Sequence, residues 1–154
     1  MIEREFYTIV RDIVKSEPFL RMRAYRHHVK SNVYAHSLRV AYYCYRHAKR
    51  HPQRYNCAEL VRGALLHDYY LYDWHEMRPG RRLHLFTHPR EALSNARRDY
   101  PTLTPTQEDI IRHHMFPVLP FPPRTRAGWV VCFYDKLAAM RDYSGKNTRT
   151  CRKK

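Results

Sequence analysis

The chain has 154 residues, a length that suits one domain able to bury a hydrophobic core without disulfides or a partner subunit. Hydrophobic residues make up 44% of it, aromatic residues 14%, and only 4 residues are glycine, which argues against a disordered chain and favours a compact helical one. The formal net charge of +15, from 29 Lys and Arg against 14 Asp and Glu, points to anionic partners.

Three helices are predicted in the first half of the chain. The first covers the apolar positions of residues 2–13 and is ended by Pro18, because proline interrupts helical hydrogen bonding. The second runs from about residue 32 to residue 50. The third covers residues 56–68 and begins with Asn56, which is a favourable N-cap residue.

The second half of the chain is predicted to hold a long loop and three further helices. Residues 69–87 are aromatic and basic with a Pro-Gly turn, which indicates a functional loop. A fourth helix has Pro89 near its start, and the capping box TPTQ at 104–107 begins the fifth. A last helix covers about residues 125–143. No strand of useful length is visible, so the sequence predicts an all-α bundle of about six helices.

The predicted organisation is a single domain over residues 1–145, followed by a basic tail, 146–154, that is expected to lie outside the packed domain. The N-terminus lacks the unbroken apolar run of a signal peptide, and no later segment suits a membrane span. The cysteines form no CxxC pair, so neither a zinc knuckle nor a disulfide framework is indicated. We expect a cytoplasmic protein with no membrane partner.

Polar residues stand where several of these helices should face the core. His36, Asp68, His114 and Asp135 all follow or share an apolar stripe. A buried carboxylate without a partner is costly, and two of them on different helices favour a common cation. Metal ions would neutralise both carboxylates at once.

The chain order of the candidate residues is His36, then His67-Asp68, then His88, then His113-His114, and finally Asp135 within FYDKLAA. This order resembles that of the metal-dependent HD phosphohydrolase superfamily. An HD dipeptide alone arises often by chance, whereas the full set from residue 36 to residue 135 is specific. The resemblance implies a compact HD-domain bundle and a metal-dependent hydrolase.

The resemblance also implies how two metal ions would be held. One ion would take His36, His67, Asp68 and Asp135, and the other would take Asp68, His88, His113 and His114. Asp68 can bridge both ions because a carboxylate has two oxygens. Two adjacent histidines on a helix diverge by about 100°, so both can bind an ion off its edge, or one of them can contact the substrate instead.

The chemistry that the resemblance implies is phosphoester hydrolysis at two divalent transition metal ions. Imidazole and carboxylate ligands favour iron or manganese, with cobalt, nickel or zinc as further possibilities. A hydroxide that bridges two such ions would attack phosphorus while both ions stabilise the developing charge. Asp68 and Lys136 are the candidate catalytic residues.

Several residues around the ligands are candidates to hold a phosphate-bearing, nucleotide-like substrate. Tyr72 can stack on a base, although a packed aromatic cluster accounts for it equally well. His27 and His28 are predicted to be ordinary surface residues. The candidate phosphate-binding residues, for which a solvated surface charge is the alternative, are Arg81, Arg82, His84, Arg124 and Lys136.

Departures from one branch of the superfamily narrow the substrate. Phosphodiesterases that act on cyclic-di-GMP typically carry a lysine three positions after the HD aspartate and a GYP motif after the double histidine. This chain has Leu71 and the segment MFPVLPFP there, which disfavours that substrate. Two other functions stay open: an oxygenase with a mixed-valence di-iron centre, and a nucleic-acid-binding or regulatory HD module, for which the basic tail is the motivation.

Overall fold

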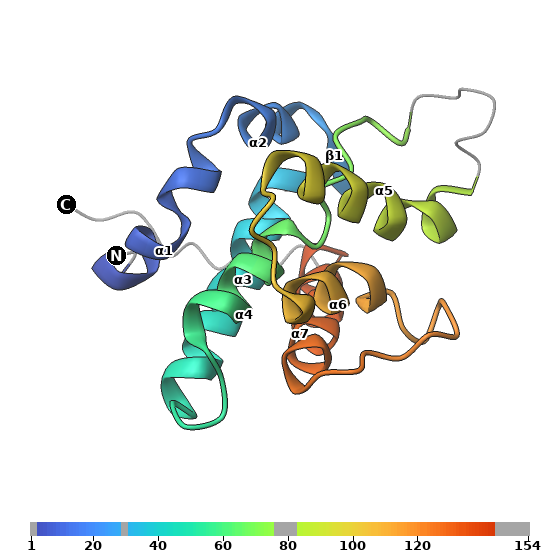
Figure 1. The fold of residues 1–154 in the computed structure, drawn as a ribbon. Helices are drawn as coiled ribbons and strands as arrows, with labels where there is room; N and C mark the ends of the chain where they lie inside the picture. The colour runs from blue at the N-terminus through green and yellow to red at the C-terminus, as the bar shows by residue number, and fades with distance from the viewer. Residues whose placement is uncertain (1–2, 29–30, 76–82, 144–154) are drawn as a thin grey trace.

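The polypeptide folds into seven α-helices, one 3-10 helix (η1) and a two-stranded sheet within the part that the structure, a computed structural model, describes: residues 3–28, 31–75 and 83–143 (Figure 1). The elements in chain order are α1 (Arg4–Val14), α2 (Glu17–Arg21), η1 (Met22–Ala24), β1 (Arg26–His28), β2 (Ser31–Asn32), α3 (Val33–Arg50), α4 (Cys57–Leu66), α5 (His84–Asp99), α6 (Pro105–His113) and α7 (Arg126–Tyr143). The predicted all-α class is confirmed.

Capping residues begin three of the helices at the predicted positions. The side chain of Asn32 accepts a hydrogen bond from the backbone N–H of Ala35, and Asn56 caps α4 in the same way. Thr104 and Gln107 form a reciprocal capping box at α6. These bonds satisfy backbone donors that have no partner inside a helix, which fixes where each helix starts.

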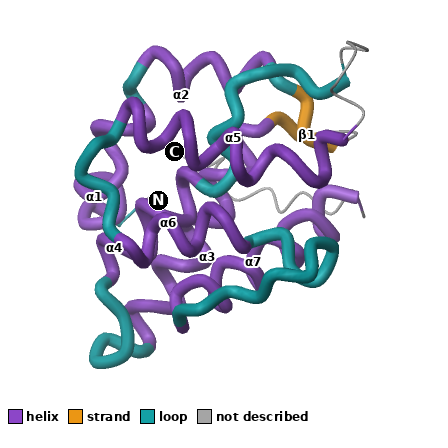
Figure 2. The backbone as a smooth tube through the Cα atoms, turned by 45° about the vertical axis from the view of Figure 1, so that its right-hand side comes forward, coloured by secondary structure: helices purple, strands orange, loops and turns teal. Residues whose placement is uncertain are grey.

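Helices α3, α4, α6 and α7 pack against one another in a closed ring, with α5 against α6 and α1 against α4 (Figures 1 and 2). Gly63 allows α4 to approach α6 closely, because a Cβ there would lie 2.6 Å from Cδ1 of Ile110. The apolar residues that line the ring are fully buried, among them Val40, Cys44, Val61, Leu65, Ile110, Ile111 and Val131. This core surrounds the polar residues of the site.

Two boundaries differ from the prediction. Pro18 lies in the first turn of a separate short helix, α2, where its missing N–H costs nothing. Helix α5 begins at His84, so Pro89 lies inside it and the long loop is shorter than expected. The carbonyl of Leu85 loses its helical partner, but that residue is 55% exposed, so water can replace the bond.

A short antiparallel hairpin also precedes α3. Arg26 in β1 pairs with Asn32 in β2, and the backbone N–H of Val33 donates to the carbonyl oxygen of Tyr25 at 3.0 Å. These strands are too short to give an alternating sequence pattern. Within the described residues, no helix has the length and apolar character needed to cross a membrane.

Candidate metal centre

Six of the candidate ligands come together, five from the ring helices or their ends and one from α5. His36 lies on α3, His67 and Asp68 at the end of α4, and His88 on α5. The last two are His114, the C-cap residue of α6, and Asp135 on α7. All six side chains are buried.

A first group of donor atoms forms around His36, His67 and two carboxylates. Nε2 of His36 lies 2.9 Å from Oδ1 of Asp135 and 3.9 Å from Oδ2 of Asp68. Nε2 of His67 lies 3.4 Å from Oδ2 of Asp68 and 3.5 Å from Oδ1 of Asp135. The two imidazoles therefore direct nitrogen atoms at oxygens of both carboxylates.

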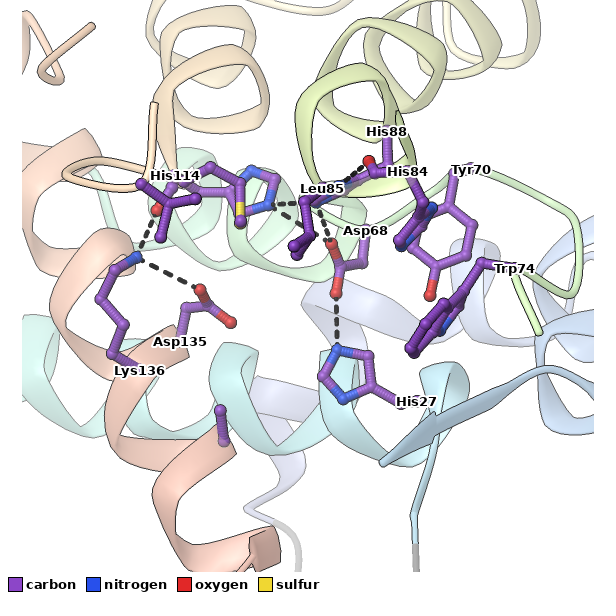
Figure 3. A pocket seen from close by; sticks show the side chains of 13 residues that line it. His27, Asp68, Tyr70, Trp74, His84, Leu85, His88, His114, Asp135 and Lys136 are labelled. Atoms are coloured by element: carbon purple, nitrogen blue, oxygen red, sulfur yellow. Dashed lines mark hydrogen bonds and ion pairs between the residues drawn. The ribbon is translucent and has the colours of Figure 1, made fainter. Parts of the chain in front are cut away.

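A second group uses the other oxygen of Asp68. Its Oδ1 lies 3.3 Å from Nε2 of His88 and 3.3 Å from Nε2 of His114, and these two nitrogens are 3.0 Å apart. Figure 3 shows His88 and His114 on one side of the Asp68 carboxylate. Asp68 thus lies between two sets of imidazole donors, with one oxygen in each.

The backbone sets the tautomer of three of these histidines. His67, His88 and His114 each place Nδ1 2.7–2.9 Å from a backbone carbonyl oxygen of the preceding helical turn. A carbonyl can only accept, so Nδ1 carries the hydrogen and donates, and in the neutral ring Nε2 keeps its lone pair. This arrangement is typical of metal-binding histidines.

A further carboxylate lies behind His36. Nδ1 of His36 lies 3.5 Å from Oδ2 of Asp142, and Asp142 also pairs with the guanidinium of Arg39. An imidazole between a ligand position and a carboxylate is oriented and made more basic by that carboxylate. The sequence analysis did not predict this role, although Asp142 follows Asp135 by two helical turns and so shares its face of α7.

Electrostatics favour a cation at the centre. Burial lowers the pKa of His67, but the charge of Asp68 and the contact with Asp135 outweigh it and raise the pKa to about 10. The pKa of both carboxyl groups lies well below its usual range, because the neighbouring imidazoles outweigh their burial. Nε2 of His67 makes no hydrogen bond within the described residues. The cluster therefore stabilises positive charge in its middle.

The donor spacing fits metal coordination. Two ligand atoms on one ion, each about 2.1 Å from it, are separated by roughly 3.0 Å at right angles and roughly 3.4 Å in a tetrahedron. The shortest contacts in the two groups are 2.9 Å and 3.0 Å, and most others lie between 3.3 Å and 3.5 Å. Facing Nε2 lone pairs on His88 and His114 repel unless a proton or a metal ion lies between them.

A cavity of about 520 Å³ opens over these residues (Figure 3). Its polar part is formed by five residues at the centre: His27, Asp68, His88, His114 and Asp135. Tyr70 and Trp74 lie on one side of Asp68 and Lys136 lies on the other (Figure 3), and the remaining wall residues are His84, Leu85, Met115, Val118 and Ala139. The candidate metal centre is therefore accessible from solvent.

The family model of the HD domain matches residues 33–140, which is more than half of the chain. The chain belongs to the HD domain family. HD domains bind divalent metal ions and are generally hydrolases, and the histidine and aspartate clusters found here can hold such ions. No curated protein and no solved structure showed a significant match to the chain.

One predicted ligand does not reach the candidate metal centre of this HD domain. Nδ1 of His113 lies 2.7 Å from Oδ1 of Asp109, and the His113 ring lines a different cavity. Arg124 lines the same cavity, and its backbone N–H donates to Asp109. Because neighbouring side chains at a helix end diverge, only His114 of the pair faces Asp68.

The other substrate-binding candidates have mixed placements. Nζ of Lys136 donates to the carbonyl oxygen of His114 at 2.6 Å and lies at the cavity. Nδ1 of His84 lies 2.9 Å from the hydroxyl of Tyr72. Burial, followed by the charge of His88, lowers the pKa of His84 to about 3, so this ring is a neutral part of the wall. Arg81, Arg82 and the tail 146–154 lie outside the described residues.

His27 reaches the candidate metal centre, contrary to the prediction that it is a surface residue. Its Nε2 lies 3.1 Å from Oδ2 of Asp68, and its side chain is 12% exposed. Figure 3 shows the His27 ring on the side of Asp68 opposite His88 and His114. No pattern in the sequence around residue 27 indicates this contact, because the hairpin that carries His27 is too short to predict.

Proposed function

We propose that this HD domain is a dinuclear metal-dependent phosphohydrolase or phosphodiesterase that acts on a nucleotide-like substrate. The observation that carries the proposal is the position of Asp68, whose Oδ2 and Oδ1 face two different groups of imidazole donors. Two ions held by these groups would supply an activated water for attack on phosphorus and would neutralise developing charge.

The residues divide into two ligand sets that share Asp68. His36, His67 and Asp135 complete the set for the first ion, and His88 and His114 complete the set for the second. All of the donors in both sets are imidazole nitrogens and carboxylate oxygens, which favours iron or manganese. His113 is left out of the proposed set because of its contact with Asp109.

The chain offers two means of holding a phosphate-bearing substrate beside this centre. The Lys136 ammonium donates one hydrogen to the His114 carbonyl and lies 3.5 Å from Oδ2 of Asp135, so at least one of its three hydrogens remains to donate to a phosphate oxygen. On the opposite wall the Trp74 ring stacks on His84, with ring centres 5.1 Å apart and planes at 5°. A flat aromatic wall favours a substrate with a planar base.

The test is a screen of nucleotides, dinucleotides and simple phosphoesters with protein reconstituted in Mn²⁺ or in Fe²⁺ under exclusion of oxygen. We expect release of phosphate or of a nucleoside monophosphate from at least one compound, and no release after metal removal. The oxygenase alternative predicts oxygen consumption without hydrolysis. The nucleic-acid alternative predicts binding that weakens steeply with salt, because phosphate contacts release counterions.

A further inference from the structure

We infer that His27 is an additional metal ligand, supplied by a hairpin that precedes the residues matched to the HD domain family. The inference rests on the proposed dinuclear centre. One nitrogen of His27 lies within 4.8 Å of donor atoms of both His36 and Asp68, and these two donors also lie within 4.8 Å of each other. His27 therefore completes a third potential ligand group in the same buried region.

The fold holds the His27 ring in place. The hairpin is joined to α3 by the hydrogen bond from Val33 to Tyr25, and β1 lies against α3 and α7. The His27 ring stacks on His36 with ring centres 3.8 Å apart and planes at 21°. A side chain fixed in this way is pre-organised for coordination.

His27 contacts the same oxygen of Asp68 that the first ligand set uses. Oδ2 of Asp68 is approached by His27 at 3.1 Å, by His67 at 3.4 Å and by His36 at 3.9 Å. The distance from His27 falls within the range of the other donor pairs and suits two ligands at right angles on one ion, which are separated by roughly 3.0 Å. An ion bound to Oδ2 of Asp68 and to the His36 and His67 rings would be within reach of His27.

With His27 included, the two ions would differ in their number of protein donors. The first would have five, from His27, His36, His67, Asp68 and Asp135, and the second would have three, from Asp68, His88 and His114. An octahedral ion with five protein donors has one position left for water or substrate. We therefore expect tighter binding of the first ion and more of the substrate contact at the second.

The test compares His27→Phe with the wild type in a titration of the metal-free full chain with Co²⁺, followed by visible absorption. Phenylalanine keeps the stacking on His36 and removes the nitrogen. We expect two Co²⁺ ions in both proteins, with one bound at least about 10-fold more weakly in the variant and with altered absorption bands. His75→Phe is the control, because His75 lies on the exposed loop and contacts Asp73.

Each outcome separates this inference from the proposed function. Wild-type protein that binds no Co²⁺ contradicts both. Two ions in the wild type with unchanged affinity and bands in His27→Phe overturn the role of His27 alone. A weaker affinity with unchanged bands means that His27 acts only by orienting Asp68, which also overturns ligation. If His27→Phe does not fold, His27→Gln is measured by the same criteria.

Discussion

Asp68 is the residue on which the histidines of the site converge. Four imidazoles, those of His27, His67, His88 and His114, place Nε2 within 3.4 Å of one of its oxygens. A buried carboxylate is tolerated only with compensating positive charge or hydrogen bonds. In the metal-free protein the His67 imidazolium supplies such charge, because its pKa, despite burial, is raised to about 10 by the charge of Asp68 and the contact with Asp135. In the metal-bound protein the ions would replace it.

The substitution Asp68→Asn tests whether Asp68 is a metal ligand. It nearly preserves the side-chain volume and removes the charge that both ions would share, so we expect metal content to fall and hydrolysis to drop at least about 100-fold. Lys136→Ala is the matched variant, because it removes a cavity residue that is not a ligand. That variant should keep both metals and show a raised KM or a lower kcat.

Metal analysis and hydrolysis rates on the two variants decide between these roles. Two metals and near-normal turnover in Asp68→Asn are incompatible with a bridging carboxylate. Loss of metal from Lys136→Ala would instead mean that Lys136 supports metal binding rather than substrate binding.

Sequence analysis predicted six of the residues that the structure brings together. Four of them, His36, Asp68, His114 and Asp135, follow or share an apolar helical stripe, and His67 and His88 were predicted from the resemblance to the HD superfamily. It named both His113 and His114 as ligands and left open whether one of them does not bind, since these neighbours point about 100° apart at the end of α6 and the sequence does not fix how that end is rotated. It also missed His27 and Asp142, because no local sequence pattern indicates their roles.

At the scale of elements, Asp109 joins α6 to the start of α7. Its carboxylate accepts hydrogen bonds from the backbone N–H groups of Arg124 and Thr125 and from the Thr125 hydroxyl. Gly128 lies so close that a Cβ there would be 2.7 Å from Oδ2 of Asp109. This buried carboxylate fixes the entry to the helix that carries Asp135.

The substitution Asp109→Asn should therefore lower stability and change its pH dependence. Burial raises the pKa of Asp109, but the bonds from Thr125 and Arg124 outweigh it and lower the pKa below its usual value. The folded state thus gains stability above the unfolded pKa of about 3.9, and the gain is lost as pH falls through the folded pKa. We expect a loss of about 1–3 kcal/mol in the free energy of unfolding at pH 7.

Urea unfolding of metal-free wild type and variant at several pH values checks this expectation. The difference between them should stay constant from about pH 5 to pH 7 and shrink below about pH 4. Glu17→Gln on the exposed side of α2 serves as the control. A difference that persists unchanged into acid would mean that the Asp109 charge does not stabilise the fold.

Local capping chemistry explains which elements the sequence predicted. Helices α3, α4 and α6 begin with Asn or Thr residues whose side chains cap them, and their starts were predicted closely. Helix α5 follows Leu83, which makes no side-chain cap, so its start could not be located from composition. Its first turn is set by packing, since His84 is buried against Tyr70, Trp74 and His88.

At the scale of the whole molecule, part of the acidic charge is buried. The chain has 14 acidic residues, and within the part that the structure describes four of them, Asp68, Asp109, Asp135 and Asp142, are buried. The exposed surface is therefore more basic than the composition alone suggests. A basic surface raises the local concentration of anionic substrates near the protein.

Metal analysis of the wild-type chain, purified without chelators and reconstituted with Fe²⁺ or Mn²⁺, tests the central claim most directly. The account predicts about two ions per chain, bound with release of protons because the imidazoles must give up their charge. A folded chain that retains no metal after this treatment would contradict the account, since the converging lone pairs and carboxylates would then need another explanation.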